Sequence, residues 1–214
     1  MVIALPYSKA HKTKTREKIL CSAWELFSSR GFMGVTVDQV MMHCSLTRGA
    51  FYAHFESKAE LYRASLLWSP SNSHLAREKP EEVDDVEWLV YLFDQYLSLE
   101  HVRGQRPCPL AFLATDVASR DTETQKIYAE IYIRVNQKIE SLLRKAQLQC
   151  SSYGGVASLT SMMIGAVAIA RNIQEDFVAE EILSACRERI VEILHSENPA
   201  SHHFNTLRVS LDPD

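Results

Sequence analysis

Residues 36–58 read TVDQVMMHCSLTRGAFYAHFESK, and this stretch decides the fold expected for the chain. Its first part has the i, i+3, i+4 spacing of a buried helical face, at Val37, Val40 and Met41. Thr36 precedes this face at the N-cap position, residues 44–46 interrupt it, and Thr47 can cap a second short helix. Two short helices joined by a tight turn predict a helix-turn-helix, whose second helix enters the DNA major groove.

The second helix combines small residues with hydrogen-bond donors. Gly49 and Ala50 allow the backbone to approach DNA closely, and Phe51 and Phe55 are four residues apart, which predicts two core anchors. The donors available for phosphates and base edges are Thr47, Arg48, Tyr52 and His54.

This stretch resembles the DNA-binding domain of TetR/AcrR-type transcriptional regulators. The resemblance rests on TREKIL at 15–20, ELFSSRGF at 25–32, TVDQV at 36–40 and LTRGAFYAHFESKAELY at 46–62. Carried over by position, it implies phosphate contacts from Thr36, Tyr52 and Lys58. It implies base contacts from Thr47, Arg48 and Gly49, with His54 serving either role.

Ser45 departs from the family pattern, which usually has a glycine in the turn. A positive φ at this serine would cost a modest amount of strain. The conformation of the turn is therefore left open by the sequence.

The charge of the chain is unevenly distributed. The whole chain carries a net charge of −4, yet residues 1–68 contain nine Lys and Arg against five Asp and Glu, a net charge of +4. A basic N-terminal part on an acidic remainder is typical of a DNA-binding head attached to a separate body.

The periodicity predicts an all-α protein of about nine helices with no convincing strand. We expect a three-helix DNA-binding domain with a basic arm over residues 1–56, a helical effector-binding and dimerisation domain over 57–195, and a flexible tail over 196–214. Within these limits the expected helices begin with Thr15–Ser29 and end with Val178–His195, with breaks at His101–Pro109 and at Gly154-Gly155. Only residues 106–121, RPCPLAFLATDVASRD, resemble a recurring stretch of the family in the body.

The family implies a small, often hydrophobic effector bound between helices of the body. The residues predicted to line this pocket are Trp68, Trp88, Phe93, Tyr96, Phe112, Tyr128, Tyr132 and Met163. Ordinary core packing is the alternative for each of them, because aromatic side chains at helical spacing usually face the core.

The family also implies a homodimer formed by the last two long helices. Small residues would allow close helix approach at Ala157, Ser161, Gly165 and Ala168, and the last helix would add Ile182, Cys186, Ile190 and Ile193. A two-fold symmetric dimer predicts a near-palindromic operator on double-stranded DNA.

The five cysteines are scattered and lack the spacing of a metal site, which favours a reducing cytoplasm. Cys108 lies between two prolines near Arg103 and Arg106, a setting that can lower a thiol pKa and suit an oxidant or electrophile sensor. A small buried apolar residue is the alternative for Cys108.

Two other classes of protein were weighed against a regulator. An enzyme is disfavoured because the chain has no Gly-rich phosphate loop, HExxH or GxSxG motif, and we expect no cofactor and no metal. A helical interaction protein without DNA binding is the second alternative, and Arg48, Tyr52 and Lys58 argue against it.

The most apolar run, Gly155–Ala170, is short for a membrane span and contains hydroxyl residues, so we expect a buried helix and no membrane partner.

Overall fold

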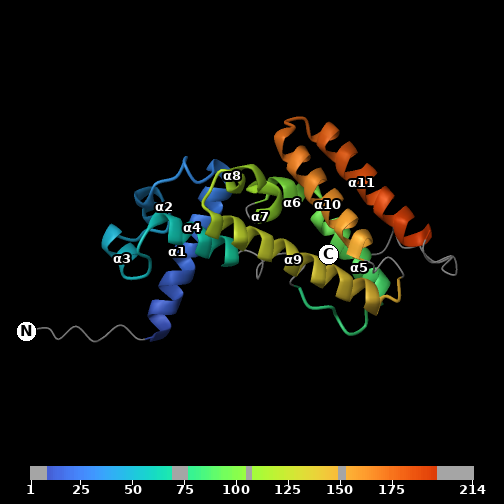
Figure 1. The fold of residues 1–214 in the computed structure, drawn as a ribbon, viewed down its shortest axis with the longest axis horizontal. Coiled ribbons are helices and arrows are strands. Elements are labelled where there is room, and N and C mark those ends of the chain that lie inside the picture. The colour runs from blue at the N-terminus through green and yellow to red at the C-terminus, as the bar shows by residue number, and fades with distance from the viewer. Residues whose placement is uncertain (1–8, 69–76, 105–107, 149–152, 197–214) are drawn as a thin grey trace, which may run out of the picture. The chain divides into compact units, whose positions relative to one another are not determined.

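The computed structural model describes residues 9–68, 77–104, 108–148 and 153–196, and Figure 1 shows its helices. Within these residues the chain forms eleven helices and no strand, which confirms the all-α prediction. The count exceeds the nine expected because short helices replace two predicted segments. Helix α6, Leu99–Arg103, extends into the break predicted at His101–Pro109, and two short helices follow that break, α7, Pro109–Phe112, and α8, Ala114–Ala118.

The chain divides into two compact units. The first unit comprises Met1–Asn72 with Arg106–Ala129, and the second comprises Ser73–Gln105 with Glu130–Asp214. This division differs from a boundary at residue 56, because the helix after the head and the segment 106–129 both pack with the head. The predicted tail lies outside the described residues from 197 onward.

The first unit begins with four helices. They are α1, Lys9–Arg30; α2, Val37–His43; α3, Arg48–Tyr52; and α4, Lys58–Trp68. Helix α1 packs against α2 and α4, and its buried face includes Ile19, Ala23 and Phe27. It starts at Lys9, six residues before the predicted start at Thr15, so residues 9–14 of the predicted basic arm are helical. Lysine and alanine favour helix, which accounts for the extension.

A left-handed glycine ends α1. Gly31 has φ +66° and its N–H donates to Phe27 O at 2.8 Å. The chain then turns Phe32 back onto the core, where its ring lies 5.2 Å from that of Tyr62. This turn fixes the position at which α2 can begin.

Ser45 adopts the left-handed conformation that the sequence left open, with φ 55°. Its N–H donates to Met42 O at 3.0 Å, and Leu46 N–H donates to Met41 O at 2.8 Å. The turn therefore keeps the geometry that a glycine would adopt without strain, and a serine bears the cost.

The second unit contains α5, Asp85–Tyr96, and α6, followed by most of α9, Thr122–Lys145, and then α10, Tyr153–Asn172, and α11, Asp176–Ser196. Helices α10 and α11 lie side by side (Figure 1), and Leu159, Val167 and Leu183 are fully buried in the core of the unit. The predicted break at Gly154-Gly155 is wrong, because α10 begins at Tyr153. Both glycines occupy the first turn, where backbone N–H groups have no partner within the helix in any case.

One arginine joins three helices of the second unit. The Arg103 guanidinium, at the end of α6, donates to Ile173 O at 2.6 Å and to Asp176 Oδ1 at 3.1 Å. It thereby satisfies a carbonyl beyond the end of α10 and an acidic residue at the start of α11, and it fixes the turn between these helices.

Candidate nucleic-acid interface

The helix-turn-helix begins with a complete capping box. Thr36 Oγ1 accepts a hydrogen bond from Gln39 N–H at 3.2 Å, and Gln39 Oε1 accepts one from Thr36 N–H at 2.8 Å. Thr36 is exposed, so its hydroxyl stands at the surface beside the start of α2. The predicted N-cap is confirmed.

Helix α3 is held by its two aromatic anchors. Phe51 is 1% exposed and Phe55 is 2% exposed, and their rings stack with centroids 5.8 Å apart. The opposite side of the helix is exposed at Thr47, Arg48, Gly49 and Tyr52. A Cβ on Gly49 would meet only Thr47 Oγ1, at 3.9 Å, so packing inside the protein does not require a glycine there. The predicted base-facing residues thus share one exposed surface on a firmly anchored helix.

Arg48 is held in place by its neighbours on the surface. Its Nη1 donates to Asp38 Oδ2 at 3.0 Å, and both side chains are 62% exposed. A hydrogen bond with Tyr52, and then the charge of Asp38, raise the pKa of Arg48. An exposed pair of this kind breaks readily, so the guanidinium can exchange Asp38 for a base edge.

Lys58 is half-buried and already makes contacts within the protein. Its Nζ donates to Val35 O at 2.7 Å and lies 4.1 Å from the centroid of the Phe32 ring. Burial, and then the positive charge of Arg120, lower the pKa of Lys58, while Asp116 opposes the shift. An ammonium group has three donors, so two are left for a phosphate.

His54 follows α3 and is half-buried. Its Nδ1 is buried and has no hydrogen-bond partner among the described residues. Burial, followed by the positive charges of Lys12 and Arg16, lowers the pKa of His54. The neutral imidazole with its proton on Nε2 fits these surroundings best, because it leaves the buried nitrogen as an acceptor without a proton to satisfy.

Asp116, on α8, is a residue to which the sequence analysis gave no role. Its Oδ2 accepts from Tyr62 Oη at 2.6 Å and its Oδ1 accepts from Phe32 N–H at 3.2 Å. Burial, and then the hydrogen bond to Asp116, raise the pKa of Tyr62. One carboxylate thus ties the turn after α1 and the middle of α4 to α8. The only signal in the sequence was that Asp116 lies in the family-like stretch 106–121.

The predicted effector residues fall in both compact units. The first unit holds Trp68, Phe112 and Tyr128, and the second holds Trp88, Phe93, Tyr96, Tyr132 and Met163. In the second unit Trp88, Phe93, Tyr96 and Met163 are buried, and the Tyr96 ring lies 4.8 Å from that of His101. In the first unit the hydroxyl of Tyr128 donates to Leu110 O at 2.7 Å. The burial of these predicted effector residues is compatible with ordinary core packing as well as with an effector site.

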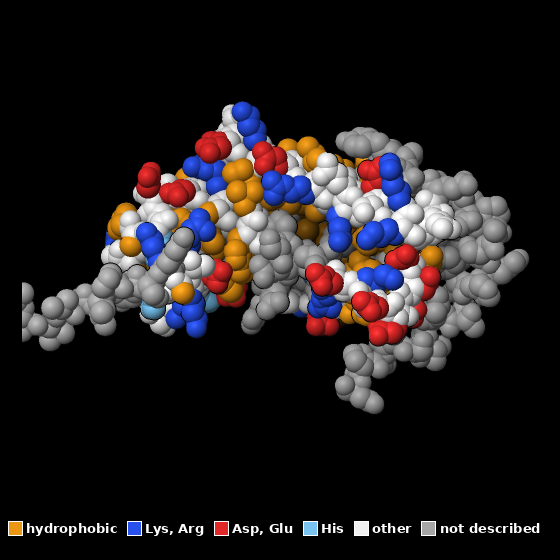
Figure 2. Space-filling model, turned by 90° about the horizontal axis from the view of Figure 1, so that it is seen from below, with side chains coloured by type: hydrophobic (Ala, Val, Ile, Leu, Met, Phe, Trp, Pro, Cys, Tyr) orange, Lys and Arg blue, Asp and Glu red, His pale blue; other side chains and the backbone are white. Residues whose placement is uncertain are grey.

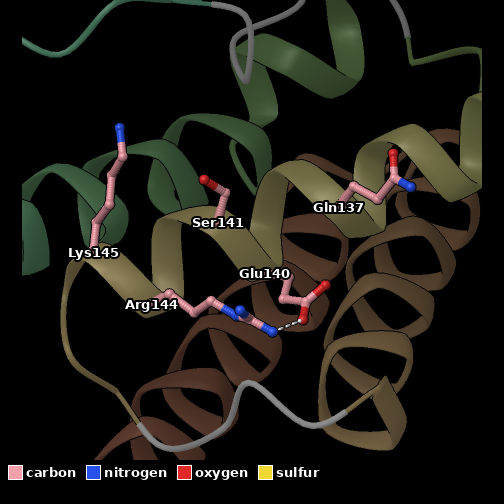
Figure 3. Close-up of a pocket in the computed structure, with 5 residues that line it drawn as sticks. All are labelled: Gln137, Glu140, Ser141, Arg144 and Lys145. Atoms are coloured by element: carbon pink, nitrogen blue, oxygen red, sulfur yellow. Dashed lines mark hydrogen bonds and ion pairs between the residues drawn. The ribbon is translucent and has the colours of Figure 1, made fainter.

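A depression on α9 is lined by none of these residues. Its lining is Gln137, Glu140, Ser141, Arg144 and Lys145, all on one helix (Figure 3). Arg144 Nη2 and Glu140 Oε1 are 2.7 Å apart across it. This surface is polar and charged, so it does not suit a hydrophobic effector.

The predicted dimer residues lie on α10 and α11 with different exposures. Cys186 and Ile190 are buried within the second unit, whereas Ser161 is exposed. The remaining five, which are partly exposed, are Ala157, Gly165, Ala168, Ile182 and Ile193. A Cβ on Gly165 would meet no atom within 4 Å, so the helix is open on that side.

Cys108 forms the N-cap of α7 and is not part of a disulfide. Arg103 and Arg106 were the two cations predicted to act on this thiol. Arg103 donates a hydrogen bond to Ile173 O in the turn between α10 and α11, and Arg106 lies outside the described residues. Burial raises the pKa of the Cys44 and Cys186 thiols, which makes these two cysteines poor nucleophiles. Cys150 also lies outside the described residues.

Within the described part of the chain, no group of three or more His, Cys, Asp and Glu side chains is arranged to hold a metal ion. No helix in the same residues is both long and apolar enough to cross a membrane.

Comparison with known proteins links this geometry to one family. Residues 19–65 match the family model described as bacterial regulatory proteins, tetR family. The chain is 27% identical to the HTH-type transcriptional regulator UidR of Escherichia coli K12 over 134 residues, which cover 62% of this chain and 66% of that protein. It thus spans just under two thirds of the length of that relative. It is 35% identical to SrpR of Pseudomonas putida over 75 residues, which cover 35% of this chain and 32% of that protein.

Solved structures share the fold over a longer range. A TetR transcriptional regulator from Chloroflexus aurantiacus aligns with a TM-score of 0.68 at 19% identity, covering 86% of this chain and 97% of that chain. The reduced form of E. coli NemR aligns with a TM-score of 0.68 at 18% identity, covering 84% and 96% of the two chains. The shared fold therefore extends well beyond the matched head.

Proposed function

We propose that this chain, which belongs to the TetR family of transcriptional regulators, is a cytoplasmic homodimeric repressor that a small hydrophobic effector releases from a near-palindromic operator. The observation that carries the proposal is the surface of α3. Two buried aromatic anchors fix this helix, and its outer side presents the residues suited to base edges.

The roles on this surface follow from position and exposure. Thr47, Arg48 and Gly49 lie at the N-terminal end of α3, which leads into the groove, and we assign them to bases. Thr36, Tyr52 and Lys58 are assigned to phosphates, with His54 at the end of the same surface. Arg48 contributes most of the sequence preference, because an arginine donating twice to a guanine discriminates about ten- to hundredfold against other bases.

The proposed dimer rests on α10 and α11. Large apolar side chains are exposed there, at Ile169 (55%), Phe177 (82%) and Val178 (38%). The outer side of α10 around Gly165 is open as well. A second copy of the chain would cover these groups and remove apolar surface from water.

The test is selection of bound sequences from a random pool of DNA duplexes with the purified protein at two salt concentrations. We expect a near-palindromic motif whose occupancy falls steeply with salt, because several phosphate contacts release counterions. Arg48→Ala should lose the motif while keeping the helical content and oligomeric state of the wild type. A folded dimer that enriches no motif at either salt concentration would favour an interaction protein without DNA binding.

A thiol sensor using Cys108 is the second candidate function. Its support is the position of Cys108, which is partly exposed and outside any disulfide at the start of α7, in the same unit as the head. Peroxide should then release the selected duplex from the wild type, whereas Cys108→Ser should stay bound under the same treatment. Equal release from both proteins would remove this candidate.

A further inference from the structure

The N-terminal turns of α1 place two cations beside the recognition helix. Arg16 lies with its guanidinium carbon 4.9 Å from the centroid of the Phe55 ring, immediately after α3. Lys12 is one turn earlier on the same face of α1, and the charges of both residues act on His54. Figure 2 shows Lys, Arg and His side chains gathered on this part of the first unit.

These cations are not neutralised inside the protein. Within the described residues neither Lys12 nor Arg16 forms an ion pair, whereas Arg48 pairs with Asp38 and Arg63 with Asp121 and Glu123. The positions three and four residues away from Arg16 on α1 hold Lys12, Thr13, Ile19 and Leu20, and none is acidic. Two like charges one turn apart destabilise a helix, so their arrangement favours an anion from outside.

His54 lies at the same place, and Lys12 and Arg16 are the charged groups that face its ring from α1. Its buried Nδ1 is the acceptor nitrogen, so the neutral ring offers a phosphate its Nε2–H donor. Stacking on Phe55 restricts the guanidinium of Arg16 before any ligand arrives, which lowers the entropy lost on binding. Two cations from α1 and one N–H donor from His54, two residues beyond α3, are therefore available to the same anion.

We propose that Lys12, Arg16 and His54 form a second phosphate-binding site, which holds the DNA backbone beside the major groove entered by α3. The proposal rests on the proposed function, since it assigns a further contact to the same DNA. The site fixes the register of the head on the duplex and carries no sequence preference, because phosphates are the same at every base pair.

The test is the salt dependence of binding to one 30-base-pair duplex carrying the motif selected above, or a mixed-sequence duplex of that length if no motif is found. The Lys12→Gln/Arg16→Gln variant should lose about 0.9 from the slope of log affinity against log salt for each phosphate contact removed. With two contacts per protomer, a dimer loses four contacts, and its loss of affinity between 50 and 200 mM salt should be about 150-fold smaller than that of the wild type. The sequence motif it selects should not change.

A matched control removes the same two charges elsewhere. Arg134 and Lys138 are also one turn apart and exposed, on the part of α9 that belongs to the second unit, and Arg134→Gln/Lys138→Gln should keep the wild-type slope. Lys12→Gln alone leaves the contact of Arg16 with Phe55, so it should show half of the decrease in slope seen in the double variant. This result separates lost phosphate contacts from a disturbed fold.

The outcomes separate the two proposals. If the wild type binds DNA with a steep slope and Lys12→Gln/Arg16→Gln keeps both that slope and the wild-type affinity, the second phosphate site is overturned and the regulator stands. A change in the selected motif would show that these residues contact bases and would overturn the phosphate assignment. If the wild type itself binds no duplex, the proposed function fails first.

Discussion

At the scale of single residues, Ser45 is the position where the turn of the helix-turn-helix is strained. A non-glycine residue in the left-handed region costs the folded state about 1–2 kcal/mol. Replacing it with glycine removes this strain, but it also stabilises the unfolded chain by about 0.4–1 kcal/mol, because glycine has more conformational freedom there. Ser45→Gly should therefore raise the free energy of unfolding by up to about 1 kcal/mol, measured by urea denaturation. Ser45→Ala keeps a Cβ in the same conformation and should not stabilise the protein. A Ser45→Gly variant less stable than the wild type would contradict this account.

His54 makes the stability of the folded chain depend on pH. Because burial, Lys12 and Arg16 lower its folded pKa below the ordinary 6.5, the unfolded chain takes up the proton first as the pH falls. The contribution of His54 to stability is full above pH 6.5 and is lost progressively below it, toward the folded pKa. The wild type should lose more stability between pH 7.5 and pH 5.5 than His54→Gln, measured as the shift in thermal midpoint. Equal losses would show that the ring is not held in its neutral form.

At the scale of elements, Asp116 joins three segments of the first unit. Asp116→Ala removes the acceptor for Phe32 N–H and Tyr62 Oη, and leaving buried donors without partners costs about 1–3 kcal/mol. We expect the free energy of unfolding to fall by that amount in urea denaturation. Tyr62→Phe, which deletes one bond and keeps the aromatic packing, should cost about 1 kcal/mol. The exposed Glu181→Ala on α11 serves as the control and should change little.

The same contact has a consequence for regulation under the proposed function. Helix α4 follows the recognition helix, and Asp116 ties it to α8. An Asp116→Ala variant that keeps normal DNA affinity but responds less to its effector would support the idea that this carboxylate transmits effector binding to the DNA-binding head. An unchanged response would show that other contacts transmit it.

At the scale of the whole molecule, the proposed dimer can be tested at Gly165. A Cβ at Gly165 meets no atom within 4 Å, and glycine weakens helices, so the folded protomer of Gly165→Arg should be as stable as the wild type or more so. In the proposed interface the added bulk and like charges would meet across the two-fold axis. Analytical ultracentrifugation should show a dimer for the wild type and for the exposed control Gln137→Arg, and a monomer for Gly165→Arg. A dimeric Gly165→Arg protein would move the interface away from this face.

The helix-turn-helix could be predicted from the sequence, because every feature that defines it is local. The N-cap at Thr36, the left-handed stop at Gly31 and the anchors Phe51 and Phe55 depend on residues within a few positions of one another. The same local rules failed at α6, which extends into a predicted break, and at the two glycines in the first turn of α10.

Contacts between distant residues could not be predicted from the sequence and became visible in the folded chain. Asp116 accepts hydrogen bonds from Phe32, 84 residues away in the sequence, and from Tyr62, 54 residues away. Arg16 on α1 likewise lies over the ring of Phe55, which follows α3. Periodicity reports which face of a helix is buried, but it does not report which other helix covers that face. The strain at Ser45 was decided in the same way, since packing α3 against the rest of the head fixes the turn whatever residue occupies it.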